Sequence, residues 1–108
     1  MGAFAVPIVP GKLDTWKGWV AELTGPRKAG FEDMNARYNL TDHRAWLQPT
    51  PDGQHMVVVV VDGPGADDFM PKLATSEDDF DAWFRAGVAE VHGIDFSGPL
   101  PPPTQRFL

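Results

Sequence analysis

Residues 42–62 constrain the fold of this chain more than any other segment. Two runs, His-Arg-Ala-Trp-Leu-Gln at 43–48 and Met-Val-Val-Val-Val-Val at 56–61, flank a Pro-Asp-Gly turn. An Asp-Gly pair between two such runs is typical of a β-hairpin, because the turn needs backbone with positive φ. The second run has no polar face, so it predicts a strand that is buried on both sides. We expect the chain's own helices to cover one face of this strand and a partner to cover the other.

Composition narrows the class of protein. The chain has 108 residues, which is enough for one domain with one hydrophobic core. Its net charge of −6, without a basic cluster, argues against binding to nucleic acid. It has no cysteine, which excludes disulfides, thiolate metal sites and a cysteine nucleophile. No apolar run approaches the ~20 residues that span a membrane, and no signal-peptide pattern opens the chain. We therefore expect a cytoplasmic protein without membrane or nucleic-acid partners.

The spacing of apolar residues predicts the order β-α-β-β-α-β. A first strand is expected at residues 3–9, and its proline restricts it to the edge of a sheet. A helix follows and is broken at Gly25-Pro26, after which a second helical segment begins. After the hairpin and a short helix, Ser76 and Asp79 are expected to form a capping box at the start of the last helix. Residues 94–96 are expected to form a short fourth strand.

This order is the ferredoxin-like pattern of the α+β class. It predicts a four-stranded antiparallel sheet with the helices on one face, in a single domain of residues 1–97. Residues 98–108 form a Pro-rich tail that favours extended polyproline structure. The open sheet face carries half of the valines, and a second copy of the chain is the simplest symmetric cover for it. We therefore expect a homodimer through this face.

With this order of elements, the chain resembles the dimeric α/β-barrel superfamily, which includes antibiotic-biosynthesis monooxygenase-like proteins and haem-degrading enzymes. The resemblance covers residues 4–96. Segments 44–51 and 83–95 are also similar to a group of uncharacterised bacterial proteins. The resemblance implies an obligate dimer with a small-molecule site between the helices and the sheet of each subunit, and it selects no substrate.

His92 is the first candidate for chemistry. It ends the last predicted helix, where the helix dipole favours an imidazolium, and it could act as a general acid or base. The alternative is that its ring caps the helix by bonding a terminal carbonyl. In the haem-degrading branch a histidine near the end of the equivalent helix ligates iron, with a tryptophan before it, as Trp83 precedes His92 here. The asparagine that this branch carries on its first strand has no counterpart at residues 4–9. We therefore expect no cofactor, with haem as the alternative.

Arg44, Trp46 and Gln48 share one face of their strand because side chains alternate along it. A guanidinium, an indole and an amide in a row could bind a carboxylated aromatic ligand, with Arg44 holding an anionic or enolate oxygen. The alternative is that Trp46 packs in the core or the dimer interface while Arg44 pairs with an acidic residue. Trp19 and Trp83 are further ligand-binding candidates, since an indole beside a cavity suits an aromatic ligand.

Two other clusters point to structural roles. His43 and His55 lie on the two hairpin arms and could lie near each other across the strands, but no third metal ligand has a suitable spacing. We expect partly exposed strand histidines and no metal site. The acidic run at residues 77–81 matches the start of a helix, where it compensates the helix dipole, and it lacks the pattern of a calcium loop.

Together these features predict a small-molecule-binding protein that acts as a cofactor-independent enzyme of the monooxygenase, isomerase or cyclase type on an apolar or aromatic metabolite. In this scheme His92 moves a proton and Arg44 holds an oxyanion. The alternative from another class is a non-catalytic ligand-binding or stress-associated module. The sequence names neither the substrate nor the face of the sheet that Arg44 and its neighbours occupy.

Overall fold

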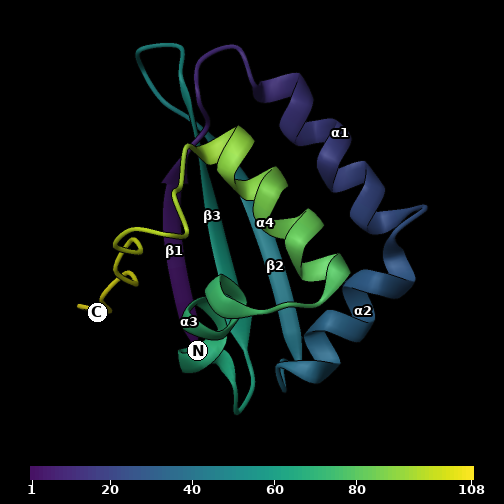
Figure 1. The fold of residues 1–108 in the computed structure, drawn as a ribbon. Coiled ribbons are helices and arrows are strands. Elements are labelled where there is room, and N and C mark those ends of the chain that lie inside the picture. Colours follow the sequence, from purple (N-terminus) through teal and green to yellow (C-terminus); the bar gives the residue numbers. More distant parts are fainter.

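The computed structural model describes residues 1–108 and has an α+β fold. Three antiparallel strands form a sheet in the order β1-β3-β2, and the helices lie over one face of it (Figure 1). A 3-10 turn at Ala66–Asp68 leads into α3. The elements in chain order are β1 (Gly2–Pro7), α1 (Leu13–Thr24), α2 (Lys28–Arg37), β2 (Asp42–Pro49), β3 (His55–Asp62), α3 (Phe69–Thr75) and α4 (Asp79–His92).

The predicted hairpin is confirmed and forms the centre of the sheet. β2 pairs with β3 so that Trp46 lies opposite Val58, and Gly53 takes a φ of 82° in the turn between them. β1 pairs with the other side of β3 and is an edge strand, as its proline predicts. The break between α1 and α2 also lies where Gly25-Pro26 predicts it.

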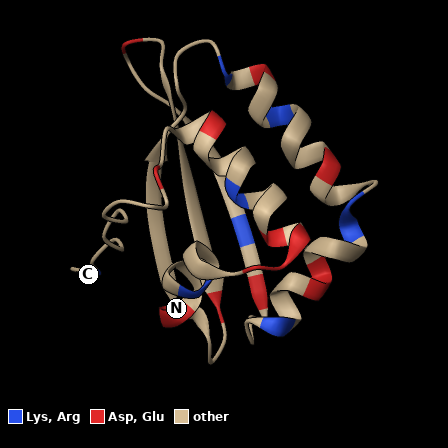
Figure 2. Ribbon diagram, in the orientation of Figure 1, with Lys and Arg blue, Asp and Glu red and all other residues tan.

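The valines of β3 divide between the two faces of the sheet. Val57 and Val61 point toward the helices and are 1% and 0% exposed, and Val59 lies on the same side. Val58 and Val60 point to the opposite side and are only partly buried. The subunit's helices therefore cover one of the two apolar faces. β1 carries no charged residue and β3 only one, at its end (Figure 2).

The expected fourth strand at residues 94–96 is wrong. Asp95 makes a turn there, because its Oδ1 accepts bonds from Ser97 N at 2.9 Å and Ser97 Oγ at 2.6 Å. The Pro-rich tail then runs beside β1 (Figure 1) and makes one backbone bond to it, from Thr104 N to Ala3 O at 2.6 Å. Pro101-Pro102-Pro103 have no N–H to donate, so this segment cannot extend a ladder. The sheet keeps three strands, with the tail along its β1 edge.

The expected capping box is also wrong. Asp78 caps α4, since its side chain accepts bonds from Phe80 N at 2.9 Å and Asp81 N at 3.2 Å. Ser76 Oγ instead accepts a bond from Asp78 N and donates one to Asp81 Oδ2. The sequence spacing found the right turn but the wrong capping residue.

α1 and α4 approach each other closely at Gly87. A Cβ atom at this position would collide with the indole of Trp19, so only glycine allows the ring to lie against the α4 backbone. This contact holds α1 against α4. None of the helices is long and apolar enough to cross a membrane.

Candidate ligand cavity

A cavity of about 300 Å³ lies between the helices and the sheet. It is lined by 20 residues, of which 15 are hydrophobic, and all three strands and all four helices contribute to it. The volume is at the lower end of the range for ligand pockets, so the cavity suits a small molecule. The aromatic part of its wall consists of Phe4, Trp16, Trp19, Phe31, Phe69 and Phe84.

β2 is an edge strand of the sheet and forms one wall of this cavity. His43, Ala45 and Leu47 are the β2 residues on the helix side of the sheet, because they alternate with the residues that face away. Ala45 lines the cavity, yet it is exposed. No helix packs tightly on this position, so we infer that the cavity opens along β2.

His92 lies at one end of the cavity and is 8% exposed. Its Nδ1 donates a hydrogen bond of 2.7 Å to the carbonyl of Pro7, at the end of β1. The predicted capping alternative is therefore wrong, since the ring binds another element and Gly93, with a φ of 69°, ends the helix. Burial lowers the pKa of His92 below its usual 6.5, and the bond to Pro7 opposes this shift. The ring is neutral at pH 7, with Nε2 unprotonated.

His43 lies at the other end of the cavity, between the rings of Phe31 and Phe69, whose centroids are 5.0 and 5.5 Å away. Its Nδ1 lies 3.0 Å from Asn35 Oδ1 and donates to it. Burial lowers the pKa of His43 to about 4, and the nearby Asp42 carboxylate opposes this shift. At pH 7 this ring is also a neutral imidazole.

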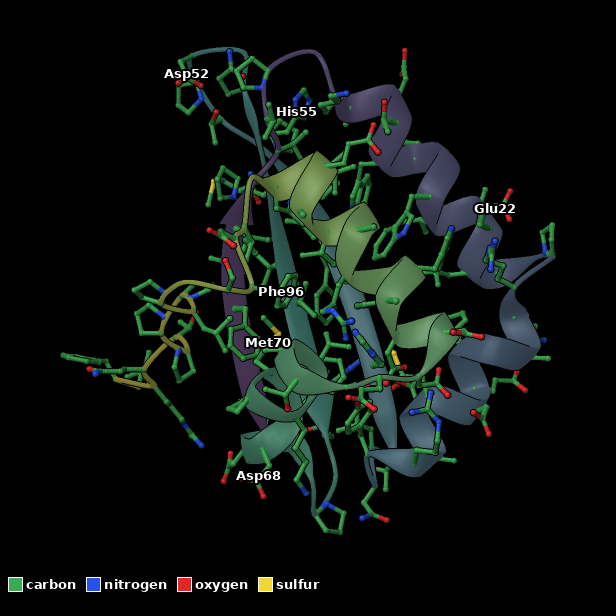
Figure 3. The ribbon with its side chains drawn as sticks, in the orientation of Figure 1. Glu22, Asp52, His55, Asp68, Met70 and Phe96 are labelled. Carbon is green, nitrogen blue, oxygen red and sulfur yellow. The ribbon has the colours of Figure 1, made fainter.

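Sequence reasoning missed His43 as a site residue. We expected His43 to lie beside His55, but the register of the hairpin separates the two. His43 lies opposite Val61, whereas His55 lies opposite Pro49 at the other end of the hairpin. The expected proximity of the two histidines is therefore wrong. His55 lies near the hairpin turn, far from the cavity residue Met70 (Figure 3). The sequence signal that could have identified His43 is its alternation with Arg44, because this places His43 on the helix side.

No group of three potential ligands is placed to hold a metal ion.

Arg44, Trp46 and Gln48 share a face as predicted, and it is the face that points away from the helices. The guanidinium of Arg44 binds Asp42 Oδ2 at 2.8 Å and Asp62 Oδ2 at 2.6 Å, both on that face. Trp46 is 50% exposed, and Arg44 Cζ lies 5.5 Å from its ring centroid. Arg44 borders the cavity, but its charged group is directed away from it. The trio does not bind a ligand together with His92 in this cavity.

The two remaining tryptophan candidates lie side by side at the interface of α1 and α4. Trp19 lines the cavity, and Trp83 stacks on it from outside with ring centroids 6.0 Å apart. The guanidinium of Arg27 also lies over the ring of Trp83, with Cζ 4.2 Å from its centroid. Trp83 therefore supports the wall and does not form part of its surface.

A second polar cluster is separate from the cavity. Asp81 is fully buried and accepts bonds from Arg37, Tyr38 and Ser76, with Arg37 Nη2 at 2.8 Å and both hydroxyls at 2.6 Å. These bonds hold the pKa of Asp81 at about 2 against the opposing effect of burial. Because the cluster is closed and fully bonded, its role is to fasten α2 to α4. This adds a tertiary ion pair to the helix-start role that the sequence predicts for the acidic run.

Comparisons with protein families, with curated proteins and with solved structures found no match for this chain. The class that the geometry defines is an α+β protein with an apolar cavity that carries a neutral imidazole at each end.

Proposed function

We propose that this protein binds a small, uncharged, mainly aromatic molecule in the cavity and moves a proton on it through His92, without a cofactor. The observation that carries the proposal is a buried imidazole at the end of an otherwise apolar cavity, with Nδ1 fixed by Pro7. A fixed Nδ1–H directs the basic Nε2 and holds the ring in one tautomer. Its lowered pKa keeps it a base at neutral pH.

Isomerisation is the reaction that these residues support best. His92 Nε2 takes a proton from an acidic C–H of the ligand and returns it to another atom, so no electrons are gained or lost. The imidazolium formed in between keeps its Nδ1–H bond to Pro7. Oxyanion stabilisation by Arg44 is not part of this proposal, since Asp42 and Asp62 hold its guanidinium on the other face. Haem does not suit the cavity, because about 300 Å³ is at the lower end for ligand pockets and haem is a large macrocycle.

The test uses 2-tetralone, an uncharged bicyclic ketone with an acidic C–H. Binding is measured by equilibrium dialysis, and loss of that proton in D₂O is followed by NMR. We expect exchange at least ~100-fold faster than with equimolar imidazole, and loss of that gain in His92→Phe. Val59→Phe, which fills the cavity, should weaken binding at least ~10-fold, while Val60→Phe on the opposite face should not.

The possible outcomes separate the two functions. Binding that Val59→Phe removes, with exchange that does not depend on His92, supports the non-catalytic binding module and overturns the enzyme. Equal binding by both valine variants, or no binding at all, overturns the use of the cavity.

We also propose that the open sheet face is the interface of a homodimer and that the finer fold is ferredoxin-like, with the tail in place of the fourth strand. The face presents Val58, Val60 and Trp46 without any helix over them. Its only cation, Arg44, is paired with Asp42 and Asp62 of the same face, so no cation is left unpaired and the residual charge of −1 lies at the end of the strands where these two carboxylates face each other. Such a face favours an apolar partner with the same properties, which a second copy supplies.

A further inference from the structure

The two imidazoles of the cavity are bound in the same way. His92 contacts a carbonyl oxygen of Pro7 and His43 contacts the amide oxygen of Asn35, each through Nδ1. Both partners are acceptors, so Nδ1 carries the proton in both rings. A neutral imidazole has only one N–H, and Nε2 therefore presents a lone pair.

Neither Nε2 atom is satisfied by the protein. Each histidine makes its only side-chain bond through Nδ1, and the one fully buried side-chain nitrogen without a partner is Nε1 of Trp19. The Nε2 atoms therefore retain accessible surface, and both rings line the cavity. Burial lowers the pKa of both rings, which keeps Nε2 an acceptor at neutral pH.

The other polar side chains around the cavity either have partners or are not presented to a ligand. Nε1 of Trp19 has no partner, but it is fully buried against the α4 backbone at Gly87. The hydroxyl of Thr24 donates to carbonyls of its own helix, at Val20 and Ala21. Arg44 is held by two carboxylates on the other face. The side-chain groups that the cavity presents to a ligand without a protein partner are therefore two imidazole acceptors and no cation.

We propose that the cavity selects an uncharged aromatic ligand that carries a hydrogen-bond donor, with a phenol or an aromatic alcohol as the simplest case. This inference rests on the proposed function and names the ligand class of the same site. A carboxylate would place its oxygens against the lone pairs of Nε2 and would lose its hydration without a cation to compensate. A donor satisfies both the ligand and the imidazole.

The position of the rings also limits ligand shape. Their separation can be read along β3. His43 lies opposite Val61 of this strand, and His92 binds Pro7, which lies opposite Met56. Five residues along a strand correspond to ~16 Å. A ligand with one donor therefore uses one ring, and only an elongated ligand with a donor at each end meets both.

The test compares three naphthalenes of nearly equal size by equilibrium dialysis near neutral pH. 2-Naphthol has a donor, 2-methoxynaphthalene has none and 2-naphthoate is an anion. We expect 2-naphthol to bind about tenfold more tightly than the ether, and the anion to bind more weakly than both. The double variant His43→Phe/His92→Phe should reduce the ratio between naphthol and ether to about one, whereas His55→Phe, outside the cavity, should leave it unchanged.

The wild-type comparison decides the inference even if the double variant does not fold. Equal binding of naphthol and ether, or tightest binding of naphthoate, overturns donor selection while the cavity remains a binding site. Retention of the naphthol preference in a folded double variant overturns the role of the two histidines. Binding of none of the three overturns the proposed function together with this inference.

Discussion

The interior of this protein holds titratable side chains in two places, and the two differ in how far their hydrogen bonds are satisfied. Around Asp81, both carboxylate oxygens accept bonds from three side chains. At the cavity, each imidazole uses one nitrogen and leaves the other without a protein partner. Burial of a polar group costs free energy unless it is hydrogen-bonded. A complete cluster therefore stabilises the fold, whereas the unpartnered Nε2 atoms of the cavity are the basis of the ligand that we propose.

The largest effect is expected at the complete cluster. Asp81→Asn leaves the Arg37 guanidinium without its buried partner and should lower the free energy of unfolding by about 3–4 kcal/mol. Asp33→Asn removes only an exposed pair with the same arginine and should cost about 0.5 kcal/mol or less. Urea denaturation measures both. Affinity for 2-naphthol should not change in folded Asp81→Asn, and a change would show that the two regions are coupled.

The cavity histidines should appear as a loss of stability in mild acid. The pKa of His43 is about 4 in the folded protein and 6.5 when unfolded, so the unfolded state binds the proton first. The stability that this shift represents is present above pH 6.5 and is lost as the pH falls toward 4, by about 2–3 kcal/mol. His92 shifts in the same direction, while Asp81 contributes only as the pH falls from about 4 toward 2.

Urea denaturation as a function of pH tests this assignment. His43→Phe should flatten the profile between pH 6.5 and 4, while His55→Phe should keep it. The groups facing His43 are Asn35, which does not titrate, and Asp42, whose charge opposes the shift. An unchanged acid profile in His43→Phe would assign the loss to other groups.

The sequence predicts a region well where the interactions that determine it are local in the chain, and poorly where they join distant residues. The hairpin, the edge position of β1 and the break between α1 and α2 depend on turn chemistry and prolines, which are local, and all three are confirmed. The prediction of a last strand is wrong because Asp95 accepts a hydrogen bond from Ser97 and makes a turn. The three prolines that follow have no N–H and prevent the tail from forming a ladder with β1. Alternation predicts that Arg44 and Trp46 share a face, but which face is covered depends on packing.

The site shows the same division. His92 could be chosen from its place at a helix end, but its bond to Pro7 joins residues 85 positions apart in the chain. The environment of His43 depends on rings from α2, α3 and α4 that meet only in the folded protein. No local pattern carries that information.

Substitutions on the open face should have the smallest effect on the stability of the subunit. Their effect on the association of two subunits should be large. Trp46 is half exposed and contacts no helix, so Trp46→Ser should change the free energy of subunit unfolding by about 0.5 kcal/mol or less. At the centre of a dimer interface the same change should weaken association at least ~10-fold, since buried tryptophans dominate such interfaces. Sedimentation velocity at micromolar concentration measures this, with Gln48→Ser on the same face as the control. If the wild-type chain sediments as a monomer, or Trp46→Ser as the same dimer, the valines of β3 remain uncovered and this face has another role.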